Sequence, residues 1–251
     1  MKADYHLHTE YSYDSRMKAK ELVDKALALN YDLIAVTEHL DLLPNELLVY
    51  GLPAFKKYCQ GMQALKERLA DTPLKLLCGI EVGDYNRVRH FADCLLEQLD
   101  LDLVMGAVHF LNDFTNVAVP LKAPLTPSEI VSYYRLNLDL VQHCKIDVIA
   151  HLGVYKRYYE DMPDESFCRD ILKDIFQTMV ERGIALEINF SSLRKPYARI
   201  LPEEWQIELY MDCGGSLFTL GSDSHLLEHF DLNYDKLPQW LFDGSLQFPR
   251  F

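Results

Sequence analysis

The sequence predicts an α/β fold built on a parallel sheet, and a barrel is the architecture that it favours. The chain repeats one alternation, in which a short apolar run is followed by a longer segment with helical spacing. Its 251 residues suit an α/β barrel that forms one domain. Its long loops gather at one end of the predicted strands, as they do in such barrels. A doubly wound sheet shares the alternation, so the pattern alone leaves that second architecture open.

Seven apolar runs, many of them containing β-branched residues, have the length of strands. Runs this apolar, separated by helices, indicate parallel strands that are covered on both faces. The runs span residues 3–8, 32–39, 74–83, 102–109, 146–152, 184–191 and 216–225.

Between these runs, apolar residues recur at helical spacing and predict six helices. The helices are expected near residues 18–29, 54–70, 88–98, 127–143, 165–182 and 203–212. The turns from helix to strand are short, whereas several connections from strand to helix are long. The long connections are expected to surround the carboxyl ends of the strands, where α/β barrels build their sites. They cover residues 40–53, 110–126, 153–164 and 191–202.

The composition does not shift along the chain in a way that marks a domain boundary, so residues 1–251 are predicted to form a single domain. Residues 226–251 form a tail that is expected to pack a short element and its aromatic side chains against the barrel. The six cysteines are scattered, without C-x-x-C spacing, and are interpreted as reduced core residues. They are Cys59, Cys78, Cys94, Cys144, Cys168 and Cys213.

The charge balance argues against one class of partner. The 38 acidic and 25 basic residues give a formal charge of −13, which is unfavourable for a groove that follows the phosphates of a nucleic acid. No apolar stretch has the length of a signal peptide or of a membrane span. We therefore expect a cytoplasmic protein with neither an extended nucleic acid nor a membrane as partner.

Side chains of the types that bind metals stand at the ends of six of the seven predicted strands. Six of the nine histidines are among them, whereas His90, His143 and His229 are not. The sixth strand ends in Asn189 and Ser191 instead. The strand-end residues are His6, His8, His39, Glu81, His109, His151, Asp223 and His225.

These strand ends are predicted to form a metal centre. His6 and His8 are two residues apart, so the alternation along a strand points them the same way. Each residue alone is explained equally well as a surface or core group, but parallel strands bring all of them to one rim. Without cations, that many carboxylates and imidazoles would repel one another and lose solvation.

The number and type of donors indicate which ions the rim binds. Eight donors are too many for one tetrahedral ion with an open position, so two or three divalent ions are expected. Imidazole combined with carboxylate suits Zn, Mn or Fe. Glu81, central in the order of the strands, is the expected bridging carboxylate.

Six motifs, in this order, resemble the polymerase and histidinol phosphatase (PHP) superfamily over nearly the whole chain. They are HLHTEYSYDS, VTEH, GIEVG, AVHF, IAHLG and TLGSDSH. The resemblance implies a distorted (β/α)7 TIM-like barrel with a trinuclear metal site at the carboxyl ends of the strands. It also implies three ligand sets, to which it adds Asp14 from the loop after the first strand. The sets are His6, His8, Glu81 and Asp223, then Glu81, His109 and His151, and finally Asp14, His39 and His225.

The segments VYKRYY and EINFSSLRK resemble the histidinol phosphatase-like branch, in which arginines of these loops hold the substrate phosphate. Arg157 and Arg194 are the corresponding candidates, and Arg87 and Arg89 are further ones. Charge supports the first pair independently, because YKRYY and LRKPYAR place five basic residues at the rim of an acidic protein. A guanidinium also matches phosphate oxygens in a bidentate way. The segment FLNDFTNVAVPL has no place in this pattern, so the leaving group stays open.

The resemblance implies a metal-dependent phosphomonoesterase that acts on a small phosphorylated substrate, with L-histidinol phosphate as the expected one. Asp223, His225 and a metal-bound water are the candidates for supplying a proton to the leaving group, and the sequence does not choose among them. One alternative is a PHP phosphoesterase that acts on nucleotides or nucleic-acid ends. Another is an amidohydrolase, which also opens with His-x-His but often bridges its metals with lysine, and a third is a non-catalytic metal-binding module. No pattern indicates the oligomeric state or the native metal.

Overall fold

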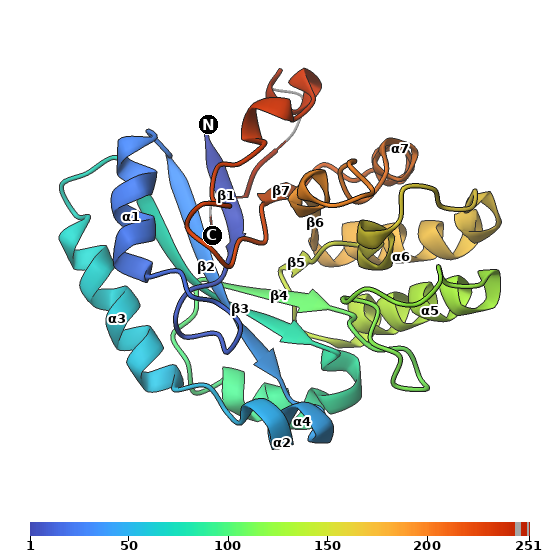
Figure 1. Ribbon diagram of the computed structural model, residues 1–251, viewed down its shortest axis with the longest axis horizontal. Helices are drawn as coiled ribbons and strands as arrows, with labels where there is room; N and C mark the ends of the chain where they lie inside the picture. The colour runs from blue at the N-terminus through green and yellow to red at the C-terminus, as the bar shows by residue number, and fades with distance from the viewer. Residues whose placement is uncertain (244–246, 250) are drawn as a thin grey trace.

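The computed structural model describes residues 1–243, 247–249 and 251, and within these residues seven parallel strands form one sheet (Figure 1). The strands are hydrogen-bonded in their sequence order. They are β1 (Ala3–Leu7), β2 (Leu33–Asp41), β3 (Lys75–Gly83), β4 (Leu103–Ala107), β5 (Val148–Ile149), β6 (Ala185–Asn189) and β7 (Phe218–Gly221).

The sheet curls until its first and last strands meet. Leu7 of β1 forms a parallel bridge with Ser224, just past β7, and the backbone N–H of His8 donates to the Ser224 carbonyl at 3.0 Å. The backbone N–H of Asp223 donates to the His6 carbonyl at 2.9 Å. A doubly wound sheet reverses its strand order and stays open at both edges. That alternative is therefore wrong, and the predicted barrel is confirmed.

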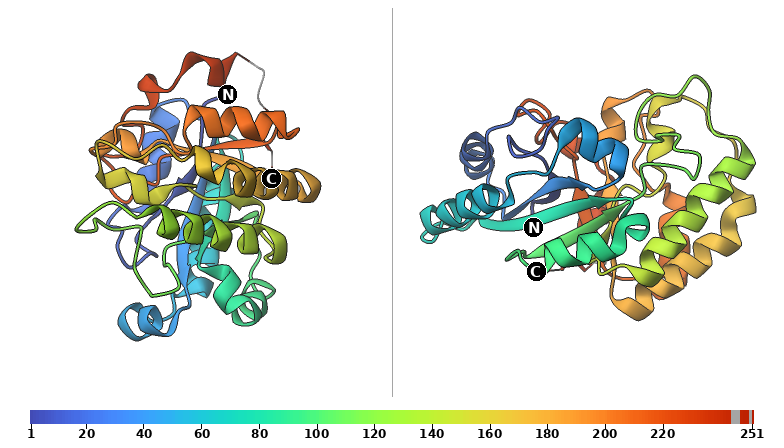
Figure 2. Two further views of the ribbon diagram at one scale, coloured as in Figure 1. Left: turned by 90° about the vertical axis from the view of Figure 1, so that its right-hand side faces the viewer. Right: turned by 90° about the horizontal axis from the view of Figure 1, so that it is seen from below.

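Helices surround the strands (Figures 1 and 2). They are α1 (Ala19–Ala28), α2 (Pro44–Tyr50), α3 (Phe55–Arg68), α4 (Tyr85–Leu96), α5 (Pro127–His143), α6 (Arg169–Arg182) and α7 (Glu204–Asp212). Six of them match predicted helices, but α2 lies in the segment 40–53 that is expected as a loop. Pro44 opens α2, and its fixed φ suits the first turn of a helix.

The fifth strand is much shorter than the predicted run of residues 146–152. It pairs through two residues with β4 and through two with β6. The chain leaves the sheet there because His151 has a φ of 26°, in the left-handed region, and Gly153 follows with a φ of 91°. This interruption distorts the barrel and brings His151 beside Glu81 of β3.

The barrel interior has an apolar floor beneath the strand ends. Side chains alternate between the two faces of a strand, so every second residue of β2, β3 and β4 faces the interior. The same alternation, continued to the carboxyl ends, places His39, Glu81 and His109 above the floor. A larger core fills the space between the strands and the helices. The floor contains Ala3, Tyr5, Leu33, Ala35, Leu77, Leu103, Met105, Ala107, Val148, Ala150 and Ala185.

The described part of the tail packs against the barrel, as expected. It contains the short 3-10 helices η4 (Tyr234–Lys236) and η5 (Gln239–Phe242). The Tyr5 hydroxyl donates to the Pro249 carbonyl at 2.8 Å, and the Tyr5 ring packs edge to face with Phe251. Residues 244–246 and 250 of the tail lie outside the described residues. In the described part of the chain, no helix combines the length and the apolar character that crossing a membrane requires.

Candidate metal centre

All nine predicted ligands lie together where the strands end. Four groups of three residues bring one ligand atom each within 4.8 Å of one another. Asp14 joins one of these groups, because its Oδ2 lies 3.2 Å from His225 Nε2 and 3.5 Å from His39 Nε2. The four groups are His6–His8–Glu81, His6–His151–Asp223, Glu81–His109–His151 and His8–His39–His225.

Glu81 stands between two of the groups. Its Oε1 lies 2.8 Å from His151 Nε2 and 3.6 Å from His109 Nε2. Its Oε2 lies 3.3 Å from His6 Nε2 and 3.5 Å from His8 Nε2. Oε2 also lies 3.1 Å from His39 Nδ1. The two oxygens therefore face different histidines, which is the arrangement that a bridging carboxylate needs.

Asp223 approaches the first group from the end of β7. Its Oδ1 lies 3.5 Å from His8 Nε2 and 3.9 Å from His6 Nε2, while its Oδ2 forms an ion pair with Arg157. Burial would raise the pKa of Asp223, but the charges of Arg157 and His6 hold it well below its usual range. The carboxylate is therefore ionised and available to a cation.

The group that contains His39 and His225 is the most open to solvent. His39 Nε2 and His225 Nε2 are 3.3 Å apart, and Asp14 Oδ2 lies near both. The side chains of His225 and Asp14 are 24% and 40% exposed, whereas that of His39 is 9% exposed. A ligand in the cavity can reach this end of the cluster directly.

The buried atoms of the cluster fit divalent cations. His6 Nε2, His8 Nε2 and Glu81 Oε2 are shielded from solvent and find no hydrogen-bond partner among the described residues. Burying polar atoms without partners costs free energy, so such atoms are normally satisfied. Imidazole nitrogens and carboxylate oxygens are ligands of Zn, Mn and Fe. A cation would satisfy these atoms together.

Glu187 of β6 holds two of the predicted ligands from behind. Its Oε1 lies 2.7 Å from His6 Nδ1, and its Oε2 accepts the backbone N–H of His151. A carboxylate in this position fixes the orientation and the tautomer of a ligand histidine. Inspection of strand ends missed Glu187, because β6 ends at Asn189. Glu187 could have been found in the sequence as the one carboxylate inside the apolar run of β6, since a buried carboxylate needs a partner.

Glu38 of β2 holds the loop that contains Asp14. Its Oε1 accepts the backbone N–H of Thr9 at 3.0 Å, and its carboxylate accepts the hydroxyl groups of Thr9 and Ser12. Ser12 also accepts the backbone N–H of His39 through its hydroxyl oxygen, at 3.0 Å. The loop after β1 is therefore fastened to β2 beside His39.

Arg157 and Arg194 lie at one side of the cluster and line the same cavity. Arg157 belongs to the 3-10 helix η1 (Val154–Tyr158), and Arg194 ends the 3-10 helix η3 (Ser191–Arg194). Arg194 donates to the Ser222 carbonyl at 2.7 Å, which fixes its side chain. Arg157 Nε and Arg194 Nη1 have no hydrogen-bond partner among the described residues. Both guanidinium groups thus keep a donor for an anion.

The expectation that five basic residues lie at the rim is wrong for two of them. Lys156 is buried, and its Nζ lies 2.8 Å from carboxylate oxygens of Glu165 and of Glu203. It therefore forms ion pairs inside the protein and does not face the rim. Arg199 lines a different cavity, beside Trp205 of α7. Together with the two arginines above, Lys195 does line the site cavity.

The remaining candidates fall outside the cluster. Arg87 stacks its guanidinium 4.5 Å from the ring centre of Phe114, Arg89 is exposed, and neither lines the cavity. Of the three histidines away from strand ends, His229 lines the cavity, whereas His90 and His143 do not.

The cavity over the cluster has a volume of about 730 Å³. Its wall includes residues of α2 and part of the segment 110–121. No role is predicted from the sequence for either segment. One wall residue, Glu46 of α2, is a buried carboxylate whose pKa is raised to about 7 by burial and by the neighbouring charge of Asp41. The cavity therefore has basic residues at one side and an acidic residue at another.

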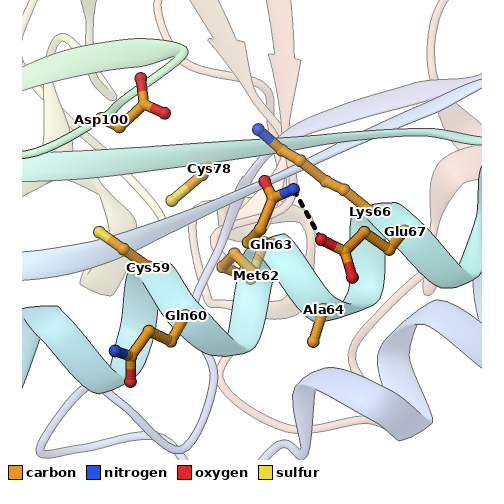
Figure 3. A pocket seen from close by; sticks show the side chains of 9 residues that line it. All are labelled: Cys59, Gln60, Met62, Gln63, Ala64, Lys66, Glu67, Cys78 and Asp100. Atoms are coloured by element: carbon orange, nitrogen blue, oxygen red, sulfur yellow. Dashed lines mark hydrogen bonds between the residues drawn. The ribbon is translucent and has the colours of Figure 1, made fainter.

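A smaller cavity of about 420 Å³ lies away from the cluster, between α3 and β3 (Figure 3). It is lined by residues such as Cys59, Lys66, Cys78 and Asp100, and by none of the predicted ligands. The chemistry predicted from the sequence therefore belongs to the larger cavity alone.

A barrel that gathers histidines and carboxylates at the carboxyl ends of its strands is typical of metal-dependent hydrolases. The family model described as PHP domain matches residues 4–191, and this chain belongs to that family. The resemblance seen in the sequence is thereby confirmed.

Several proteins resemble the chain over nearly its full length. The histidinol-phosphatase of Lactococcus lactis is 28% identical over 242 residues, which cover 94% of this chain and 88% of that protein. The probable histidinol-phosphatase of Clostridium acetobutylicum is 27% identical over 241 residues, covering 92% and 89%. A crystal structure of histidinol phosphate phosphatase from L. lactis, complexed with Zn, L-histidinol and phosphate, matches with a TM-score of 0.84 at 25% identity. That match covers 98% of this chain and 95% of the other.

Proposed function

We propose that this protein is a metal-dependent phosphomonoesterase that hydrolyses L-histidinol phosphate to L-histidinol and phosphate. One observation carries the proposal: nine metal-type residues gather at the strand ends, seven of them line one cavity, and Arg157 and Arg194 line the same cavity with an N–H donor each that no described residue uses. Cations and guanidinium groups in one cavity suit a phosphate ester. The relatives named histidinol-phosphatase support the choice of substrate.

The proposed ligands would hold two or three divalent ions. His6, His8, Glu81 and Asp223 form one set, Glu81, His109 and His151 a second, and Asp14, His39 and His225 a third. Glu81 is shared because its two oxygens face different histidines. Zn is favoured over Mn and Fe, since a relative of the same fold is described with Zn.

When bound, such ions lower the pKa of coordinated water and neutralise the oxygens of a phosphate. The side chains of this protein supply the remaining functions. Arg157 and Arg194 hold the phosphate from one side, and their fixed contacts with Asp223 and Ser222 keep both guanidinium groups in place before the substrate binds.

The leaving alkoxide needs a proton when its bond to phosphorus breaks. Asp223 and His225 are the candidates, and their side chains lie 3.6 Å apart. Arg157 keeps Asp223 ionised, so Asp223 is better suited to accept a proton than to donate one. His225 is the better candidate, but its Nε2 lies 3.2 Å from Asp14 in the third ligand set, so it carries a proton to donate only while that set holds no ion.

A phosphoesterase that acts on nucleotides or nucleic-acid ends is the second candidate within the family. The formal charge of −13 disfavours a long polymer but not a mononucleotide. A single domain over residues 1–251 and a cytoplasmic location stay predictions from the sequence.

The test combines metal analysis of the purified protein with a substrate panel. The panel contains L-histidinol phosphate, AMP, an oligonucleotide with a 3′-phosphate, a peptide amide and a lactone. We expect bound divalent metal and the highest kcat/KM on L-histidinol phosphate. Preference for AMP would support the nucleotide alternative, and amide or lactone hydrolysis would support the amidohydrolase reading.

A pair of histidine variants tests the metal centre itself. His151→Ala should abolish turnover and lower the bound metal, since His151 Nε2 lies 2.8 Å from Glu81. His143→Ala is the control, because His143 is about half exposed and contacts only Asp139 at the helix surface. Near-normal turnover by His151→Ala would contradict the scheme, and bound metal without any turnover in the unaltered protein would favour a structural module.

A further inference from the structure

A second group of acidic side chains, none of them a predicted metal ligand, lies beside the cavity, and one of its members approaches a ligand, since Asp41 Oδ1 lies 3.9 Å from His109 Nδ1. Asp41 ends β2, Glu46 lies in α2, and Asp84 follows β3. Each has one buried carboxylate oxygen without a hydrogen-bond partner among the described residues, namely Asp41 Oδ1, Glu46 Oε2 and Asp84 Oδ2. Three such oxygens in one place are costly, because a buried carboxylate oxygen without a hydrogen-bond partner loses solvation, and burial accordingly raises the pKa of Asp84 to about 6.

The backbone places Asp41 and Asp84 side by side. Asp41 is the register partner of Gly83 in the β2–β3 ladder, and Asp84 is the next residue after Gly83. The Asp41 carboxylate lies over Gly83, where any Cβ would collide with it. Each aspartate has one oxygen in use, since Asp41 Oδ2 accepts the Tyr13 hydroxyl at 3.1 Å and Asp84 Oδ1 accepts the Phe110 N–H at 3.2 Å.

Glu46 differs from the two aspartates, because it alone of the three lines the cavity. It is 6% exposed, and no described residue donates a hydrogen bond to its Oε2. Residues at positions i, i+3 and i+4 of a helix share a face, so Glu46, Val49 and Tyr50 form one side of α2. All three line the cavity. This face of α2 therefore presents a carboxylate to whatever the cavity holds.

The two sides of the cavity carry opposite charge. Arg157 and Arg194 come from the loops after β5 and β6, whereas Glu46 comes from the connection after β2. In the closed seven-stranded barrel β2 lies three strands from β5 and three from β6, so these walls are opposite and the proposed ligands at the strand ends lie between them. A cavity of this polarity is complementary to a molecule with a phosphate at one end and a cation at the other.

We propose that Glu46 binds the ammonium group of the substrate, so that the cavity selects phosphomonoesters whose alcohol carries a primary amine close to the ester. Glu46 is thus a specificity residue, and this assignment rests on the proposed function. An ammonium group suits the position better than a divalent ion. Asp41 and Asp84 do not line the cavity, so a ligand at the α2 wall meets the single carboxylate of Glu46. Ca²⁺ takes six to eight oxygen ligands. An ammonium offers three N–H donors, and the Glu46 carboxylate lines the cavity with acceptor capacity that no described residue uses.

The test compares two esters on the metal-loaded protein. One is L-histidinol phosphate, and the other is 3-(imidazol-4-yl)propyl phosphate, which lacks only the amine and its stereocentre. Glu46→Gln keeps the size of the side chain and removes its charge. Hydrogen bonds to charged groups correspond to roughly a 10- to 100-fold effect. We expect kcat/KM to fall by about that factor on the amine ester, mainly through KM, and to stay within about twofold on the deaminated ester.

Two controls make the result specific to charge in the cavity. Glu67→Gln alters a surface carboxylate of α3 that contacts Gln63, and it should leave both esters unaffected. Glu46→Asp keeps the charge on a shorter side chain, and it should retain part of the preference for the amine ester. Glu46→Asp also replaces Glu46→Gln as the decisive variant if the latter does not fold. Binding of L-histidinol in the presence of phosphate, followed by calorimetry, gives a readout that needs no turnover.

The outcomes separate the two proposals. Equal loss of kcat/KM on both esters in Glu46→Gln, or no loss on either, overturns the role of Glu46 and leaves the phosphatase assignment intact. If the unaltered protein hydrolyses both esters equally well, the role of Glu46 is likewise overturned. If the unaltered protein with bound metal hydrolyses neither ester, the proposed function fails, and unchanged L-histidinol binding in Glu46→Gln would then overturn the role of Glu46 separately.

Discussion

Replacing Glu187 by glutamine removes the negative charge behind His6 and keeps the size of the side chain. With a cation at its Nε2, His6 carries its proton on Nδ1, which lies 2.7 Å from Glu187 Oε1. The other oxygen of Glu187 accepts the backbone N–H of His151. A glutamine amide has one acceptor oxygen, so its NH₂ group must face one of these two donors.

The expected magnitude follows from this geometry. Loss of the carboxylate behind a ligand histidine typically lowers metal affinity by about 10- to 100-fold, or roughly 1.4–2.8 kcal/mol. Glu187 is 0% exposed, so no water can take the place of the lost contact. Two proposed ligands depend on it at once. We therefore expect the upper half of the range for Glu187→Gln.

The assay is a competition titration with a chelator, in which free Zn²⁺ is buffered and bound metal is measured. Turnover on L-histidinol phosphate is followed across the same metal concentrations and should recover at high Zn²⁺. Glu97→Gln is the control, because the Glu97 side chain is 68% exposed and pairs with Lys145 at the surface. A metal affinity within about twofold of the unaltered protein would refute the positioning role of Glu187.

Three further outcomes are expected. Arg157→Lys keeps the charge but loses the planar fork, so KM and the inhibition constant for phosphate should both rise about tenfold, and unchanged phosphate inhibition would count against a phosphate-binding role. In the metal-free protein, burial would lower the pKa of His109, but Glu81 raises it to about 9, and a metal must displace that proton. Zn²⁺ affinity should therefore increase from pH 7 to about pH 9 and then level off, with proton release measurable by calorimetry in two buffers; an affinity independent of pH would contradict this. In Gly221→Ala the new Cβ collides with the Glu187 carboxylate, so the free energy of unfolding, measured with urea, should fall by about 1–3 kcal/mol. An unchanged unfolding midpoint would show instead that the Glu187 side chain moves aside without cost.

Most of the barrel could be predicted, because its strands are apolar and its helices are long enough to show their periodicity. The α2 helix could not, since it has seven residues and no side-chain cap. The shortening of β5 could not either, because the left-handed backbone of His151 is held by tertiary contacts rather than by local sequence.

The ligands at strand ends could be predicted because parallel strands all point their carboxyl ends at one rim. Asp14 entered through a family resemblance, since loop conformation is not readable from residue spacing. Glu187 and Glu46 escaped notice for different reasons. Which face of β6 turns inward is known only once the register is fixed, and Glu46 lies in a segment that was expected to be a loop.

The seam between β1 and β7 has a consequence for how the protein is made. His6 and His8 leave the ribosome first among the proposed ligands, and Asp223 and His225 leave it last. A growing chain thus carries an incomplete ion-binding cluster until its final strand emerges, and joining the two ends then closes a very long loop at an entropic cost. Cation binding would supply free energy at that step, so closing the barrel and loading the metal would be thermodynamically coupled.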